Sequence, residues 1–261
     1  MGENILIVTL GCPKNTVDSE NMAYLLQQQG HTILDDPQDA DVIIINTCGF
    51  IHDAKEESVE AIMQAVALKE VKQKLRIIVT GCLAQRYAKE LAEEIPEADV
   101  FVGTGNFYEI AEMIGQSDRI NLGDIDSEIV ETGRILTTPP HYAYIKLAEG
   151  CDKHCTYCII PKIRGRQRSR KMEDIVREAR RLAKEGVREL ILIAQDTGEY
   201  GTDLYGERKL AELLILLDQI EELRWIRLLY VYPETIDDKL IAVMANAKRI
   251  LPYIDIPFQH I

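Results

Sequence analysis

The stretch Asn4-Ile-Leu-Ile-Val-Thr-Leu10, followed at once by Gly11-Cys12-Pro13, sets the pattern for the N-terminal part of this chain. A short apolar run bounded by Gly and Pro is typical of a buried strand, so we expect a strand that ends at a cysteine. The pattern occurs twice more, with Asp41-Val-Ile-Ile-Ile-Asn46 before Cys48 and Arg76-Ile-Ile-Val-Thr80 before Cys82. Apolar residues at helical spacing follow each strand. This alternation predicts an α/β fold with a parallel sheet.

The three strand-end cysteines, Cys12, Cys48 and Cys82, are expected to lie at one edge of that sheet. Right-handed crossovers between parallel strands place all of the strand-to-helix turns on the same side. Three thiolates that meet there could hold an iron–sulfur cluster with one iron lacking a protein ligand. Two alternatives stay open: buried cysteines that act as small hydrophobic residues, and a zinc site.

The remaining signals complete the first domain. Thr16 is the expected N-cap of the first helix, which Gly30 ends. Asp99-Val-Phe-Val102 predicts a fourth strand, and a short helix is expected near residues 107–114. Residues 116–140 are polar and contain Thr137-Thr-Pro-Pro140, so we expect a linker there. The predicted domains are residues 1–136 and 137–261.

The second domain carries a local cysteine group, Cys151-Asp-Lys-His-Cys155-Thr-Tyr-Cys158. Three thiols within this short loop can converge on one inorganic centre, and the lack of a fourth nearby cysteine leaves one iron of a cubane cluster open. A zinc site completed by His154 and free structural thiols are the alternatives. Ala143-Tyr-Ile-Lys-Leu-Ala-Glu-Gly150 predicts a strand directly before the loop, so the cysteines would lie at the carboxyl end of a strand, where parallel α/β folds place reactive groups.

The chain after the loop again alternates between strands and helices. Strands are expected at 189–194, 225–231 and 253–257, with helices between them. A basic run precedes the first of these helices and consists of Lys162, Arg164, Arg166, Arg168, Arg170 and Lys171. It is expected either to bind carboxylates or phosphates or to form a solvated linker.

The strand followed by C-x3-C-x2-C resembles the radical S-adenosylmethionine (SAM) superfamily, which implies a partial β/α barrel. In that family the three loop cysteines, here Cys151, Cys155 and Cys158, hold a 4Fe-4S cluster that reductively cleaves SAM. Four strand–helix units are fewer than the family's usual number, so we expect the sequence to end inside the barrel and Gln259-His260 to be interior in the parent protein.

The additional separated cysteines resemble the methylthiotransferase subgroup, whose N-terminal domain holds an auxiliary 4Fe-4S cluster. The stretches Gly11-Cys-Pro-Lys-Asn15, Ala194-Gln-Asp-Thr197 and Pro257-Phe-Gln-His260 are similar to the branch that modifies a small-subunit ribosomal protein. This resemblance implies a methylthio group added to the β-carbon of an aspartate, with the substrate protein free or within the ribosome. It also implies SAM, two clusters and an external electron donor. The family's C-terminal β-barrel module has no counterpart in this sequence.

Four further residues are cofactor-binding candidates because they lie in the loop or at expected strand ends: Tyr157, Gln195, Asp196 and Gln259. For each, ordinary turn or strand packing is the alternative. Two other functions stay open for the whole chain. One is a transfer-RNA (adenosine) methylthiotransferase of the MiaB type, and the other is a non-catalytic zinc or iron–sulfur binding module.

Composition limits the cellular setting. The formal charge of −13 disfavours direct nucleic-acid binding, because phosphate neutralisation needs an excess of Lys and Arg. The sequence has no apolar run near the ~20 residues that span a bilayer, and no signal peptide, so we expect a cytoplasmic protein that does not bind membranes. Six cysteines in that compartment favour metal binding or catalysis over disulfides.

Overall fold

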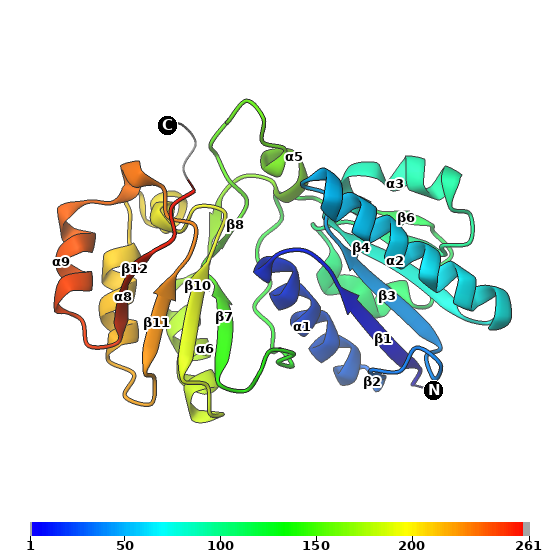
Figure 1. The fold of residues 1–261 in the computed structure, drawn as a ribbon, viewed down its shortest axis with the longest axis horizontal. Helices are drawn as coiled ribbons and strands as arrows, with labels where there is room; N and C mark the ends of the chain where they lie inside the picture. The colour runs from blue at the N-terminus through cyan, green and yellow to red at the C-terminus, as the bar shows by residue number, and fades with distance from the viewer. Residues whose placement is uncertain (1, 258–261) are drawn as a thin grey trace. The chain divides into compact units, whose positions relative to one another are not determined.

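The computed structural model describes residues 2–257, so Gln259 lies outside the described residues. The chain forms two compact units, each of them discontinuous in sequence (Figure 1). Unit 1 consists of Met1–Ile135 and His154–Gly165, and unit 2 consists of Leu136–Lys153 and Arg166–Ile261. The division into domains 1–136 and 137–261, made from the sequence, stays a prediction.

Unit 1 is built on a parallel sheet of strand order β2-β1-β3-β4-β5-β6. The strands of this sheet are β1 (Asn4–Thr9), β2 (Thr32–Leu34), β3 (Val42–Thr47), β4 (Arg76–Gly81), β5 (Val100–Val102) and β6 (Ile120–Asn121). Every residue of β3 is buried, as expected for a central parallel strand covered on both faces. The α/β class and the parallel sheet are therefore confirmed.

Helices cover both faces of this sheet. One core cluster joins Ile5, Val42 and Ile44 to Met22 and Leu26 of α1 (Pro13–Gln28). The other joins the alternate strand positions, such as Ile43 and Ile45, to α2 (His52–Val71) and α3 (Cys82–Glu94). Figure 1 shows α1 on one side of the sheet and α2 on the other. The order in which strands are added to the sheet thus reverses between β1 and β3, and parallel α/β sheets bind ligands beyond the carboxyl ends of the strands at such a switch point.

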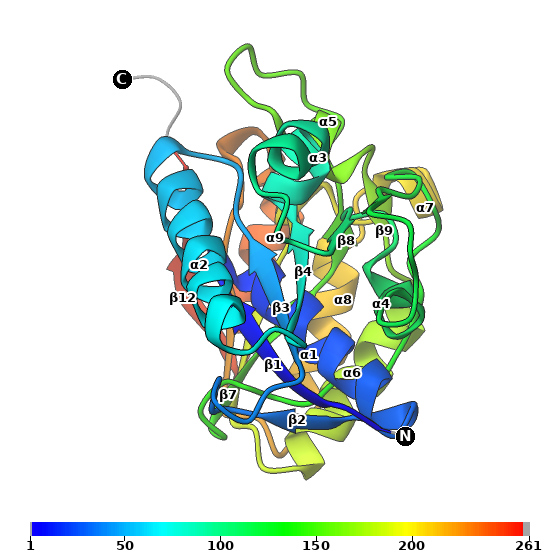
Figure 2. The ribbon, with the colours of Figure 1, turned by 90° about the vertical axis from the view of Figure 1, so that its right-hand side faces the viewer.

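Three shorter helical segments complete unit 1: η1 (Phe107–Glu109), α4 (Ile110–Met113) and α5 (Ile160–Arg164). The helix expected near residues 107–114 is therefore split. Helix α5 follows the cysteine loop in sequence but packs beside α3 (Figure 2). Its carbonyl at Ile163 accepts a 2.5 Å hydrogen bond from the Thr104 hydroxyl, which fixes this segment to the loop after β5.

Unit 2 contains a second parallel sheet of order β12-β11-β10-β7. Its strands are β7 (Tyr142–Lys146), β10 (Glu189–Ile193), β11 (Trp225–Leu228) and β12 (Ile250–Ile254). The longer helices are α6 (Met172–Lys184), α8 (Leu210–Asp218) and α9 (Asp238–Asn246). The short elements are β8 (Ala148–Glu149), β9 (Arg168–Ser169), η2 (Thr197–Glu199), α7 (Thr202–Tyr205) and η3 (Pro233–Thr235). Four parallel strands with intervening helices fit the expected partial β/α barrel.

Several local expectations were wrong. The first helix begins at Pro13 rather than after Thr16, because the fixed φ of proline suits the first helical position and Cys12 precedes it with extended backbone. The strand expected over residues 225–231 ends at Leu228, and Tyr230 then has φ +59°, which is incompatible with an extended strand. The edge strands β2 and β6 were missed, since two or three residues carry too little periodicity.

Across residues 2–257, no helix combines the length and the apolar character that crossing a bilayer requires.

Candidate functional site

The structure brings Cys12, Cys48 and Cys82 together at the carboxyl edge of the unit 1 sheet. Cys12 follows β1, Cys48 follows β3 and Cys82 begins α3 directly after β4, and these three strands are neighbours. Burial is the main cause that raises the pKa of Cys48, and the negative charges of nearby Cys82 and Cys12 add to it, while Cys12 acts on Cys82 in the same way. The structure thus places the three strand-end cysteines at neighbouring strand ends, and their role as cluster ligands stays a prediction.

Glycines allow the strand ends to approach this closely. Gly11 has φ +87°, and a Cβ added there would lie 2.6 Å from Cys48 Cβ and 3.0 Å from Cys48 Sγ. Gly81 has φ +91°, and its added Cβ would lie 2.4 Å from Asn46 Oδ1. A side chain at either position would therefore need a left-handed backbone and would collide with the site. The two glycines keep the Cys12 and Cys82 turns against the end of β3.

Cys48 is held from helix α2 by a buried serine. The Cys48 N–H donates to Ser58 Oγ at 3.0 Å, and the same hydroxyl lies 3.1 Å from the Cys48 carbonyl oxygen. Ser58 is fully buried. The same hydroxyl donates to the Ala54 carbonyl at 2.7 Å, so Ser58 fixes the Cys48 N–H while its single proton is shared with the first turn of α2.

A buried cation, Arg164 of α5, contacts the same site. Its side chain donates from Nη1 to Asp18 Oδ2 at 2.7 Å and from Nη2 to Asn15 Oδ1 at 2.6 Å. Burial is the main cause that raises the pKa of the Cys82 thiol, while the charge of Arg164 and a hydrogen bond from it act in the opposite direction. Burial likewise raises the pKa of Cys48. The Cys82 thiol is therefore desolvated, and the Arg164 guanidinium is near enough to oppose the effect of burial on its pKa.

The second cysteine group is divided between the two compact units. Cys151 belongs to unit 2, whereas Cys155 and Cys158 belong to unit 1, where the Cys158 N–H donates to the Cys155 carbonyl at 3.0 Å. The N–H of Lys153 donates to Cys151 Sγ at 3.4 Å. Tyr157, a cofactor-binding candidate, is 67% exposed. Its aromatic side chain therefore takes no part in the core.

Unit 2 anchors the start of the cysteine loop through Lys153. Its ammonium lies 2.8 Å from Asp196 Oδ2 and 2.8 Å from Glu234 Oε1, and it sits 4.1 Å from the centre of the Tyr232 ring. Burial raises the pKa of Asp196, and the hydrogen bond and charge of Lys153 oppose this rise. The structure therefore places the candidate Asp196 beside the loop, as the partner of a loop lysine.

Gln195, the neighbouring candidate, lies at the carboxyl end of β10 with both polar atoms of its amide buried. Within the described part of the chain, neither its Oε1 nor its Nε2 has a hydrogen-bond partner. Buried amides without partners are costly and usually mark a place for water or a ligand. Among the described residues, the amide of Gln195 therefore has hydrogen-bonding capacity that the protein does not use.

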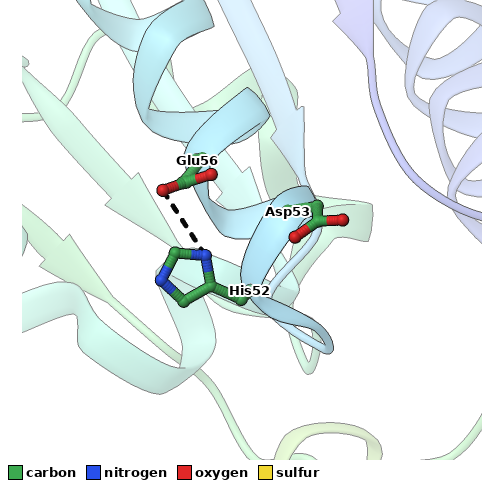
Figure 3. A group of neighbouring side chains, drawn as sticks. All are labelled: His52, Asp53 and Glu56. Atoms are coloured by element: carbon green, nitrogen blue, oxygen red, sulfur yellow. Dashed lines mark ion pairs between the residues drawn. The ribbon is translucent and has the colours of Figure 1, made fainter.

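A further group of potential metal ligands lies at the start of α2: His52, Asp53 and Glu56 (Figure 3). Among the His, Cys, Asp and Glu residues of 2–257, these three form a group in which the potential ligand atoms all lie within 4.8 Å of one another. All three side chains are exposed, and His52 Nδ1 pairs with Glu56 Oε1 at 3.4 Å. An exposed i,i+4 pair in the first turn of a helix is common without a metal.

Sequence reasoning found the cysteines but missed the residues that support them. Ser58 and Asn15 look like ordinary helix residues in the sequence, and only their burial shows their roles. Arg164 lay inside a recognised basic run, but the two interpretations of that run were ligand binding and a solvated linker. The run itself contains no signal that marks Arg164, because Lys162 and Arg166, two residues to either side, are exposed whereas Arg164 is buried.

Two family descriptions match the two parts of this sequence. Residues 4–103 match "Uncharacterized protein family UPF0004", and residues 145–261 match "Radical SAM superfamily". The chain is 50% identical to a protein of Thermoanaerobacter sp. (strain X514) over 99% of its own length, and 52% identical to one of Caldanaerobacter subterraneus subsp. tengcongensis over 98%. Both relatives are described as "Ribosomal protein uS12 methylthiotransferase RimO". The chain spans 60% of the length of each.

Solved structures agree on the fold. The radical S-adenosylmethionine methyltransferase TsrM from Kitasatospora setae, solved with tryptophan and aza-SAM, matches all of this chain and 60% of its own. The TM-score is 0.67 at 12% identity. The cobalamin-dependent S-adenosylmethionine radical enzyme OxsB matches 94% of this chain and 42% of its own, with a TM-score of 0.54. At such low identity these likenesses concern the fold alone.

Proposed function

This chain belongs to the radical SAM methylthiotransferase family that includes RimO, and from that premise we propose that it transfers a methylthio group to ribosomal protein uS12. The acceptor in this proposal is the β-carbon of an aspartate. The observation that carries the proposal is the gathering of Cys12, Cys48 and Cys82 at one sheet edge, in a chain that also has the C-x3-C-x2-C loop.

The six cysteines form two ligand sets in this proposal. Cys151, Cys155 and Cys158 would hold the 4Fe-4S cluster to which SAM binds, and Cys12, Cys48 and Cys82 would hold an auxiliary 4Fe-4S cluster. When bound, these groups supply one-electron chemistry able to activate an unactivated C–H bond, together with the sulfur and the methyl group to be transferred. Electrons would come from an external donor.

The strand-end thiols do not form a ready-made site for a single zinc ion. Three thiolates on one tetrahedral zinc lie about 3.8 Å apart, given a Zn–S distance of ~2.3 Å. In the described part of the chain, Cys12, Cys48 and Cys82 are not among the groups whose ligand atoms all lie within 4.8 Å of one another. A cubane binds each thiolate at a different iron, so it does not require the three thiols to meet at one ion.

The other residues of the chain position and enclose these groups. Ser58 fixes the backbone of Cys48, and Lys153 fixes the loop start through Asp196 and Glu234. The unpartnered amide of Gln195 is available to hydrogen-bond SAM, which has both donor and acceptor groups. Tyr157 is kept as a proposed cofactor contact, because its exposed ring lies between two loop cysteines in sequence. Gln259 is proposed as a cofactor contact only because its stretch of sequence resembles the family.

Anaerobic reconstitution of two triple variants tests this function. Cys12→Ala/Cys48→Ala/Cys82→Ala should fall from about eight irons per chain to about four and still cleave SAM when a chemical reductant replaces the electron donor. It should no longer modify a uS12-derived peptide, as followed by mass spectrometry. Cys151→Ala/Cys155→Ala/Cys158→Ala should lose both SAM cleavage and modification.

Three outcomes would contradict the proposal. Zinc without iron in the reconstituted wild-type chain would favour a metal-binding module. Modification of a transfer RNA with no reaction on the uS12 peptide would place the chain in the other branch. Equal iron content in the strand-end triple variant and the wild type would remove these cysteines from the ligand set.

A further inference from the structure

We propose that Arg164 is a positioning residue of the auxiliary site, holding the segment that carries Cys155 and Cys158 against the pocket of Cys82 and compensating the negative charge there. This inference rests on the proposed function, because it takes Cys12, Cys48 and Cys82 as cluster ligands. It adds a residue from the loop segment to a site otherwise formed by the first 82 residues of the chain.

Burial is the first step of the argument. Arg164 is only 3% exposed, and its partner Asp18 is 4% exposed, although the two lie 146 residues apart in sequence. Taking an arginine and a carboxylate out of water is expensive, and a buried pair is often no more stabilising than packed apolar residues. Stability alone is therefore a weak reason for this pair, which is better explained by a role in the site.

The direction of each donor is the second step. Asn15 Nδ2 donates to the carbonyls of Leu10 at 2.8 Å and Thr47 at 3.1 Å, so its Oδ1 is turned toward Arg164. Asp18 and Asn15 each take one N–H of the guanidinium, which has five. The guanidinium also hydrogen-bonds the thiol of Cys82, and the first turn of α3 that carries Cys82 lies beside α5. A rigid planar fork can satisfy all three acceptors at once.

Charge is the third step. Asp18 lies on α1, and its charge acts on the Cys82 thiol in the opposite direction to that of Arg164 but less strongly, and Arg164 also hydrogen-bonds that thiol. Hydrogen bonds to ligating sulfurs and nearby positive charge are main determinants of the reduction potential of an iron–sulfur centre. We therefore expect Arg164 to raise the potential of the auxiliary centre and to slow the loss of iron from it.

The test uses a background in which only the auxiliary site can bind a cluster: Cys151→Ala/Cys155→Ala/Cys158→Ala. In this background Arg164→Gln should lose iron to a chelator about 10-fold faster or more, as is usual for outer-shell partners of metal ligands. Its midpoint potential, measured by anaerobic redox titration, should shift to lower values. Lys162→Gln is the matched control, because it removes a charge from the same helix at an exposed position and should change neither quantity.

A second variant covers the case in which Arg164→Gln does not fold. Arg164→Lys keeps the charge opposite Asp18 but offers a single ammonium, which cannot reach three acceptors in a plane. It should still lose iron several-fold faster than the background. Asp18→Asn/Arg164→Gln removes both charges of the buried pair; it should recover stability toward thermal unfolding and still show the lower potential.

The outcomes separate the two levels of the proposal. If the background chain binds iron and the Arg164 variants match it in potential and iron retention, Arg164 is only a structural ion pair and this inference is wrong. If the background chain binds no iron, the ligand assignment under the proposed function is wrong, and this inference falls with it.

Discussion

Replacing Gly11 by alanine tests whether the first strand-end turn presses directly against Cys48. Gly11 lies between β1 and Cys12 with φ +87°, and an added Cβ would lie 2.6 Å from Cys48 Cβ. Gly30 offers a matched control, because its φ is +86° and an added Cβ there meets nothing within 4 Å. The two substitutions share the backbone penalty, and only Gly11→Ala adds the collision.

The expected magnitudes follow from these two contributions. A non-glycine residue in the left-handed region costs about 1–2 kcal/mol, and the lower entropy of the unfolded alanine chain returns about 0.4–1 kcal/mol. Gly30→Ala should therefore destabilise unit 1 by about 1 kcal/mol. Forcing a methyl group into a packed site costs a further ~1–3 kcal/mol. Gly11→Ala should therefore cost about 2–4 kcal/mol.

Native-state hydrogen exchange measures the difference in the stability of unit 1 between Gly11→Ala and Gly30→Ala. The amides of β3 are buried at the centre of the unit 1 sheet, so their slow exchange reports the opening of that unit. Peptides of β3 should exchange faster in Gly11→Ala than in Gly30→Ala, at the same pH and temperature. Equal exchange in the two variants would refute the argument, because it would mean that Cys48 does not occupy the space above Gly11.

Two further predictions concern single buried or paired groups. Ser58→Ala should destabilise unit 1 by about 1–3 kcal/mol, because the Cys48 N–H loses its buried acceptor; a urea titration that differs from wild type by less than 0.5 kcal/mol would contradict this. Burial alone would raise the pKa of Glu212, but hydrogen bonds from Lys239 and Lys209 outweigh it and lower the pKa to about 2. The pKa of Glu212 in the folded chain lies below its ordinary value. The ionised carboxylate therefore contributes to the free energy of unfolding above about pH 4.5, and this contribution is lost as the pH falls toward 2. The Glu212 side chain is 30% exposed. After allowing for solvent screening, we expect its ionised form to contribute about 1 kcal/mol to the free energy of unfolding. Glu212→Gln should remove that part of the acid dependence, and an unchanged acid unfolding curve in the variant would contradict the assignment.

The sequence by itself determined the class of the fold and which cysteines are candidates for binding a metal centre. Apolar runs that end at Cys12, Cys48 and Cys82 predict parallel strands, because a strand covered on both faces is apolar throughout, and β3 is buried along its whole length. The spacing of Cys151, Cys155 and Cys158 is local and needs no fold to be recognised. Local signals failed at the boundaries, since Pro13 starts the first helix earlier than Thr16 would.

Only the tertiary structure decided how the strand-end site is supported. Arg164 and Asp18 lie 146 residues apart, and no periodicity or motif in the sequence links two residues at that distance. The basic run looked uniform in the sequence, yet folding buries Arg164 and exposes Lys162 two residues earlier. The reason is physical: a charge in a chain is solvated by default, and it is buried only where the fold supplies partners for its donors.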